Sequence, residues 1–110
     1  MSDINQIFLT GRLGQDPEFK YFETGSKNAK FSIGVNRWNK KAEKEIVTWL
    51  PCVAWGSIAE YVGEYIKKGD LVFISGSLQK ETWQDSNGIQ KSNTYVLIEQ
   101  IKTQSKKQGE

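Results

Sequence analysis

The chain has 110 residues, which suits one compact domain, and 15 basic against 13 acidic residues leave a formal net charge of only +2. One cysteine, Cys52, and no histidine exclude an intrachain disulfide and a histidine-based catalytic site, and they argue against a zinc site. The first residues do not read as a signal peptide, and no apolar run approaches the about 18 residues of a membrane span, so we expect a cytoplasmic protein with no metal, no other cofactor and no membrane contact.

The first part of the chain reads as short strands separated by turns. Residues 4–13 predict a first strand, in which Gly11 marks a bulge or a sharp bend, and residues 14–17 predict a turn. Residues 29–36 alternate between apolar and polar side chains, which is typical of a half-buried strand. The polar residues 37–45 predict a flexible hairpin loop.

Residues 46–56, IVTWLPCVAWG, predict the next strand and carry two of the four tryptophans. Trp49 and Trp55 are separated by an even number of positions, so their rings project from the same face, about 20 Å apart at ~3.3 Å per residue. Pro51 has no N–H to donate to a ladder, so we expect an unpaired or bulged position there.

Residues 57–68 predict a short helix, because apolar side chains recur at three- and four-residue spacing. Ser57 with Glu60 matches a capping box at the start of this helix. Lys67 and Lys68 suit its C-terminal end, where the helix dipole favours positive charge.

Two more strands complete the chain. Residues 71–78 predict a strand whose first half, 71–74, is apolar on both faces, so one face suits a core and the other needs a partner, a subunit or a ligand. Asn87-Gly88 is a hairpin signal, and residues 95–101 predict the returning strand.

Three strands, a short helix and two strands are the layout of the OB-fold, an all-β, five-stranded Greek-key barrel with a short helix between strands 3 and 4. We therefore expect an OB domain over residues 1–102 and a polar, disordered tail over residues 103–110. Other small barrels share much of this order. The expected core residues are Ile7, Leu9, Phe31, Ile33, Val35, Val53, Val72, Ile74, Val96 and Ile98.

No catalytic pattern stands out, since the carboxylates are scattered and histidine is absent, so an enzyme is not expected. The tryptophans have basic neighbours instead: Arg37 and Lys40 lie near Trp38, and Lys80 lies near Trp83. Exposed aromatic rings beside cations suit single-stranded nucleic acid, because every base has a π-face that can stack. At this point the alternative that the tryptophans fill the core stays open.

Three stretches carry a resemblance: NQIFLTGRLGQDPEFKYFETG, FSIGVNRW and TWLPCVAWGSIAEYVGEYIKKGDLVFISGSLQKETWQDSNG. Over about residues 5–101 the chain resembles the bacterial-type single-stranded DNA-binding proteins. The resemblance implies an OB-fold that assembles as a homotetramer, with DNA wrapped around it. The base-stacking and basic positions that it implies are Trp38, Trp49, Trp55, Trp83, Lys20, Lys67 and Lys68.

The chain departs from the family pattern at three places. Lys80-Glu81-Thr82 is less basic than the usual segment before Trp83, and Ser57 stands where a lysine is common. Family members usually continue into a linker and an acidic tip that recruits other proteins, whereas this sequence stops at KKQGE. The resemblance therefore indicates a truncated chain or a short form without the acidic tail, and tail-mediated recruitment of replication and repair proteins is doubtful.

The expected function is sequence-independent binding and protection of single-stranded DNA during replication, recombination and repair. The alternative is an OB-fold module that binds RNA or protein within a replication or primosome assembly. We expect a cytoplasmic, nucleoid-associated location, with a plastid left open.

Overall fold

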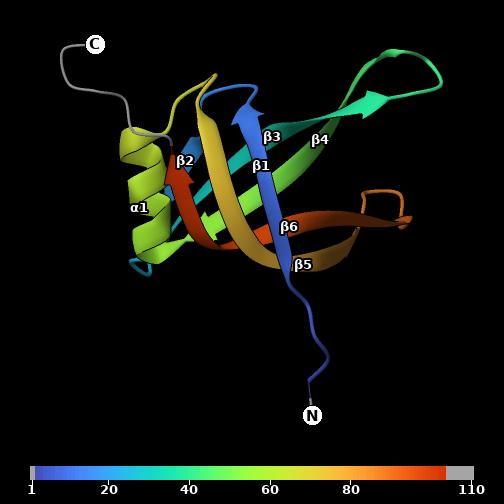
Figure 1. Ribbon diagram of the computed structural model, residues 1–110. Helices are drawn as coiled ribbons and strands as arrows, with labels where there is room; N and C mark the ends of the chain where they lie inside the picture. The colour runs from blue at the N-terminus through green and yellow to red at the C-terminus, as the bar shows by residue number, and fades with distance from the viewer. Residues whose placement is uncertain (1, 104–110) are drawn as a thin grey trace.

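Residues 2–103 are the part of the chain that the computed structural model describes, and they form a closed β-barrel with one helix against it (Figure 1). The elements are β1 (Ile7–Leu13), β2 (Glu18–Tyr21), β3 (Lys27–Asn39), β4 (Lys44–Trp55), α1 (Gly56–Tyr65), β5 (Leu71–Gln84) and β6 (Gln90–Thr103). The predicted tail lies outside the described residues except for Thr103, which ends β6.

The barrel closes because β1 pairs with both β5 and β3. The sheet order is β1-β5-β6-β4-β3-β2, so five strands form the barrel and β2 is an additional edge strand on β3. The predicted all-β OB-fold is confirmed. The helix lies between β4 and β5, one strand later than the predicted numbering, because the short β2 adds a strand to the count.

Alternating side chains of the strands fill the barrel, as the sequence pattern indicates. Phe31 and Ile33 of β3 lie opposite Cys52 and Leu50 of β4, and this face is turned inward. Val53 is not part of the core, contrary to prediction, because it lies on the other face of β4 between the inward Cys52 and Ala54. The buried core residues are Leu13, Ala29, Phe31, Ile33, Cys52, Ala54, Ala59, Val62, Ile66, Val72, Ile74, Val96 and Ile98.

The predicted flexible loop over residues 37–45 is wrong. β3 continues to Asn39 and β4 begins at Lys44, so only residues 40–43 connect the two strands. The amide N–H of Ala42 donates to Asn39 Oδ1 (2.8 Å), which tightens this turn. Because the outer arms of this hairpin face solvent on both sides, their polar sequence looks like a loop although they pair as strands.

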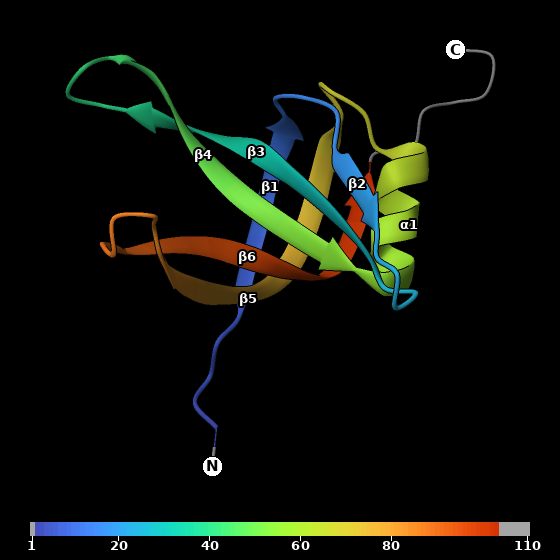
Figure 2. The ribbon, with the colours of Figure 1, turned by 180° about the vertical axis from the view of Figure 1, so that it is seen from behind.

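The β5–β6 hairpin is also longer than predicted, and its tip is held by Asp85. Oδ1 of Asp85 accepts hydrogen bonds from the amide groups of Asn87 (2.9 Å) and Ile89 (3.0 Å). Gly88 has a φ of 78°, which glycine adopts without strain. The β3–β4 and β5–β6 hairpins project from the same side of the barrel, away from α1 (Figure 2).

Pro51 is neither bulged nor out of register, contrary to prediction, because it lies directly opposite Ser32 in β3. The carbonyl of Ser32 accepts from the amide of Gly14 (3.3 Å) and therefore points away from β4. Ser32 and Pro51 thus form a non-hydrogen-bonded pair of the antiparallel ladder, in which no N–H is required of Pro51 on the β3 side. The nitrogen of Pro51 faces β6 instead.

The helix also starts and ends differently from the prediction. Trp55 is its N-cap residue and no side chain caps it, so the capping box of Ser57 and Glu60 is wrong. Glu60 instead forms a salt bridge with Lys27 of β3, and this hydrogen bond raises the pKa of Lys27 above its usual value. The helix ends at Tyr65, before the two lysines that were predicted for its last turn.

Candidate nucleic-acid interface

Three tryptophans share the outer face of the β3–β4 hairpin. The register between these strands is unbroken, so alternate residues of both strands lie on one face, and Trp38, Trp49 and Trp55 all belong to it. Their exposed fractions are 59%, 56% and 46%, and that of Trp83 is 47%. The prediction that Trp49 and Trp55 share a face is confirmed, and the alternative that the tryptophans fill the core is wrong.

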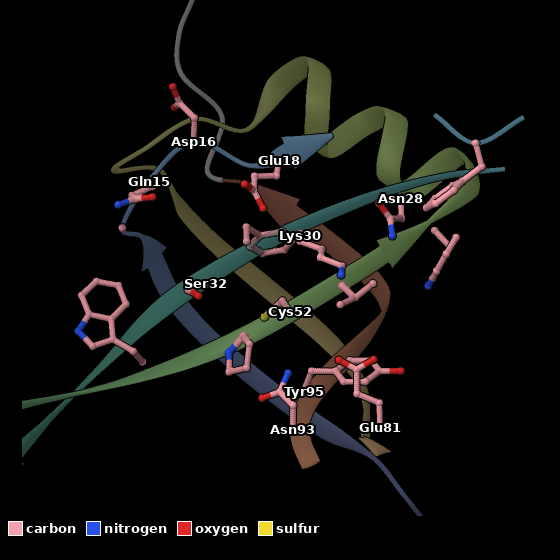
Figure 3. Close-up of a pocket in the computed structure, with 17 residues that line it drawn as sticks. Gln15, Asp16, Glu18, Asn28, Lys30, Ser32, Cys52, Glu81, Asn93 and Tyr95 are labelled. Carbon is pink, nitrogen blue, oxygen red and sulfur yellow. The ribbon is translucent and has the colours of Figure 1, made fainter. Parts of the chain in front are cut away.

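A groove of about 770 Å³ runs along this face between Trp49 and Trp55 (Figure 3). Its floor consists of two cross-strand pairs, Lys30 with Val53 and Ser32 with Pro51. The side chains of Glu81, Asn93 and Tyr95 on the β5–β6 hairpin form one wall, and those of Gln15, Asp16 and Glu18 form the other.

The ring of Trp49 packs directly over two glycines, Gly14 and Gly34. Gly34 lies directly opposite Trp49 in the ladder, and a Cβ there would be 3.0 Å from ring atoms Cζ3 and Cη2. A Cβ at Gly14 would be 2.8 Å from Cζ3, closer than real Cβ contacts come. The two glycines therefore leave the space that the ring occupies at one end of the groove.

At the other end, Trp55 is part of an aromatic stack. The ring of Phe22 lies 5.8 Å from the ring of Trp55 at an interplanar angle of 24°. The ammonium of Lys20 lies 5.1 Å from the centre of the Phe22 ring, within the range of a cation–π interaction. One side of Trp55 is thus supported by protein, and Lys20 is brought to this end of the groove through Phe22.

Trp83 extends the aromatic surface along the second hairpin. It pairs with Lys91 and lies on the same face of β5 as Glu81, which lines the groove. Lys91 also lies 3.9 Å from the carboxylate of Asp85. Lys80 precedes Glu81 in β5 and therefore points to the opposite face of the strand. It does not lie beside Trp83, although the sequence predicted that it would.

The basic residues near Trp38 are similarly divided. Arg37 pairs with Ile46 and lies on the opposite face of the hairpin from Trp38, whereas Lys40 is exposed in the connecting turn. Trp38 itself pairs with Glu45 and stands beyond the groove, towards the tip of the hairpin.

Lys67 and Lys68 lie in the loop after α1, which is attached to the loop after β1. The amide of Lys68 donates to Asp16 Oδ1 and the amide of Lys67 to Asp70 Oδ2, both at 2.8 Å. Both lysine side chains are exposed, and Asp16 is a wall residue of the groove. The structure therefore places these two cations at the corner formed by the two loops.

Comparison with known proteins agrees with this arrangement of an OB barrel, an aromatic groove and cations around it. The model of the single-strand binding protein family matches residues 4–104. The chain belongs to this family. Membership assigns it single-stranded DNA binding and no enzymatic activity, as the sequence predicted.

Curated family members with similar sequences come from cyanobacteria. Single-stranded DNA-binding protein 1 of Synechocystis sp. is 40% identical over 99 residues, covering 89% of this chain and 81% of its own. The single-stranded DNA-binding protein of Thermosynechococcus vestitus is 37% identical over 105 residues, covering 94% and 85%. That of Nostoc sp., single-stranded DNA-binding protein 1, is 35% identical over 106 residues, covering 96% and 87%.

In this family member, sequence reasoning did not select Phe22, Lys30 and Lys91, although the structure places all three beside the tryptophans. Lys30 was recognisable as outward-facing from the alternation of its strand. That its face is the face of Trp49 and Trp55 follows only from the cross-strand register. The stacking of Phe22 on Trp55 depends on the turn between β2 and β3, which periodicity does not describe.

A second exposed apolar surface lies on the outside of β1 and β5. It includes residues 71–74, for which the sequence predicted apolar side chains on both faces of the strand. Val72 and Ile74 are buried, whereas Phe73 between them is 48% exposed and Phe8 is 75% exposed. Both phenylalanines line a shallow apolar hollow over β1, β5 and β6.

No side-chain cluster among residues 2–103 has the composition of a metal site. Cys52 is buried under the groove, and this burial raises the pKa of its thiol to about 12, so the thiol stays protonated and unreactive at neutral pH. Within the same residues, no helix has both the length and the apolar content to cross a membrane.

Proposed function

We propose that the protein binds single-stranded DNA without a sequence requirement and protects it during replication, recombination and repair, with bases stacked on Trp38, Trp49, Trp55 and Trp83. The observation that carries the proposal is the groove itself, because half-exposed tryptophans stand at both of its ends. Stacking on an aromatic side chain contributes about 1–3 kcal/mol per base and accepts any base.

The phosphates are held by cations that surround the groove. Lys67 and Lys68 are exposed in the loop beside the groove, and Lys20 reaches it through Phe22. Lys40 is exposed in the β3–β4 turn, beyond Trp38. Since Arg37 and Lys80 lie on the far faces of their hairpins, they contact DNA that passes around the hairpin edges. The proposed phosphate contacts are Lys20, Arg37, Lys40, Lys67, Lys68 and Lys80.

The similarity to cyanobacterial proteins named for single-stranded DNA binding supports this function. We propose that the protein acts beside DNA in the cytoplasm.

We further propose that the protein is a homotetramer. The exposed Phe8 and Phe73 support this assembly, because an apolar surface of this kind on a small domain is typically covered by another subunit. Multi-angle light scattering tests it, and a monomer mass that does not change with concentration would contradict it.

Titration with oligo-dT while the tryptophan fluorescence is recorded tests the stacking mechanism. We expect strong quenching at low salt, and a logarithm of the binding constant that falls by about 0.7 per phosphate contact for each unit of log salt concentration. Absence of quenching at low salt, or quenching that is independent of salt, would refute the mechanism. Oligo-U as a competitor shows whether RNA enters the same site.

A further inference from the structure

A row of side chains crosses the strands at the Trp55 end of the groove. Lys20 of β2 pairs with Asn28 of β3, and Asn28 pairs with Trp55 at the end of β4. Residues in cross-strand register project from the same face of a sheet, so these side chains all belong to the groove face, where Asn28 and Trp55 line the groove (Figure 3). Because β3 lies between Lys20 and Trp55, their backbones are about 10 Å apart at the ~4.8 Å spacing of neighbouring strands.

Phe22 connects the two ends of this row. Its ring stacks on that of Trp55, with the ring centres 5.8 Å apart, and the ammonium of Lys20 lies 5.1 Å from the centre of the Phe22 ring. Asn28, which stands between Lys20 and Trp55 in the row, is only 5% exposed. The ring of Phe22 therefore spans the distance between a cation and a surface on which a base can stack.

The turn between β2 and β3 fixes the backbone of Phe22. The amide of Phe22 donates to the carbonyl of Ser26 (2.8 Å), and the carbonyl of Phe22 accepts from the amide of Gly25 (2.9 Å). Gly25 has a φ of 93°, which glycine adopts without strain. Because both backbone groups of Phe22 are hydrogen-bonded within the turn, the fold sets the position of this residue before DNA binds.

The ring of Phe22 is also the contact that orients the ammonium of Lys20. Within residues 2–103, Lys20 forms neither an ion pair with a carboxylate nor a side-chain hydrogen bond. A cation–π contact attracts the ammonium to the ring face and leaves N–H donors available for a further partner. The ammonium is thus oriented by Phe22 and still able to bind a phosphate oxygen.

We propose that Phe22 is a positioning residue of the DNA-binding site, which holds the Trp55 ring and the Lys20 ammonium in the relative places that one nucleotide requires. The base of this nucleotide stacks on the face of Trp55 that Phe22 leaves open, and its phosphate binds Lys20. This inference rests on the proposed function and adds to it a coupling between one stacking contact and one phosphate contact.

The coupling predicts that an uncharged side chain contributes to the salt dependence of binding. The salt slope reports how many phosphates are neutralised by cations of the protein. A substitution that only removed apolar surface would lower the affinity at every salt concentration and leave the slope unchanged. Loss of the Phe22 ring should also lower the slope, because the ammonium of Lys20 is then no longer held beside the stacked nucleotide.

The test is the affinity for end-labelled oligo-dT, measured by anisotropy at several salt concentrations. Phe22→Leu should weaken binding about fivefold to fiftyfold at low salt and reduce the slope by about 0.7, the value of one phosphate contact. Lys20→Gln should reduce the slope by the same amount. In the double variant Phe22→Leu/Lys20→Gln the slope should fall by about 0.7 and no further, because both changes remove the same contact.

Phe19→Leu is the matched control. Phe19 precedes Lys20 in the same strand, but its ring packs over Gly63 of α1, where a Cβ would be 2.9 Å from ring atom Cδ1. The same chemical change at this position should leave both the affinity and the slope unchanged.

Two further substitutions at Phe22 separate the ring from its bulk. Phe22→Tyr keeps an aromatic ring and should retain the slope of the wild type, whereas Phe22→Met keeps the size without a ring and should behave like Phe22→Leu. Circular dichroism and thermal unfolding establish that each variant is folded. Because the Leu and Met variants carry the same expectation, either of them decides the outcome.

The outcomes separate this inference from the proposed function. An unchanged slope in Phe22→Leu and Phe22→Met, an equal loss in Phe19→Leu, or additive slope changes in the double variant would overturn the role of Phe22 while DNA binding stands. Absence of binding of the wild-type protein to oligo-dT at low salt would overturn the proposed function and the role of Phe22 together.

Discussion

The packing of the Trp49 ring over Gly14 gives the sharpest test of the proposal that bases stack on the tryptophans. The three atoms nearest to a methyl group placed at Gly14 all belong to this ring, the closest at 2.8 Å, and Gly14 does not have a left-handed φ. Gly14→Ala therefore displaces the ring without straining the backbone. Because the ring is half-exposed, it can move outward, and we expect the free energy of unfolding to change by less than about 1 kcal/mol.

The effect on DNA binding should be much larger than the effect on folding. Removal of the ring in Trp49→Ala should cost the ~1–3 kcal/mol of one stacked base, which is about a fivefold to 150-fold loss in affinity. Gly14→Ala should lose a substantial part of the same energy, because the ring is present but displaced from the end of the groove.

A double-mutant cycle identifies the cause of that loss. In the Trp49→Ala background, Gly14→Ala should have no effect on the affinity for labelled oligo-dT, because the clashing ring is gone. Wild-type affinity of the single Gly14→Ala variant, or the same loss in both backgrounds, would show that the position of this ring does not determine binding.

Three further outcomes are expected. Lys68→Ala should weaken oligo-dT binding and reduce the salt slope by about 0.7, and an unchanged slope would remove this lysine from the phosphate contacts. Phe73→Glu should lower the mass measured by light scattering while the circular dichroism spectrum is preserved; an unchanged mass would place the subunit interface elsewhere. Cys52 has a folded pKa of about 12 against 9.0 for an unperturbed thiol, so its contribution to stability is complete below pH 9 and declines as the pH rises towards 12. Urea unfolding from pH 8 to 11 should show a steeper loss for the wild type than for Cys52→Ala, and parallel curves would contradict the shift.

Local periodicity was enough to predict the five barrel strands, the helix and the shared face of Trp49 and Trp55, but not the short edge strand β2. These features depend on residues that are close in sequence, where the alternation of a strand or the turn of a helix acts directly on hydrophobic burial. Hence the OB-fold followed from the order of the elements. The limits of the elements did not follow, since solvated hairpin arms such as those around Asn39 and Gln84 have the composition of loops.

The composition of the site was less predictable, because it depends on contacts between distant strands. Arg37 and Lys80 neighbour tryptophans in the sequence but lie on the opposite face, since adjacent residues of a strand point in opposite directions. Lys30 lies on the face of the tryptophans because of the cross-strand register. Phe22 reaches Trp55 because of the turn between β2 and β3. Proximity in sequence therefore assigned some basic residues wrongly to the face of the tryptophans and missed others that do lie on it.

The nitrogen of Pro51 has a consequence for the shape of the groove. β4 and β6 pair in parallel only at Cys52 with Val96 and Val53 with Leu97, and Pro51 is the next residue of β4. Since its nitrogen faces β6 and carries no hydrogen, the ladder cannot continue by the next bond. The two hairpins separate from this point. The absence of an N–H at Pro51 therefore prevents further pairing of β4 with β6 and leaves the groove between the hairpins open.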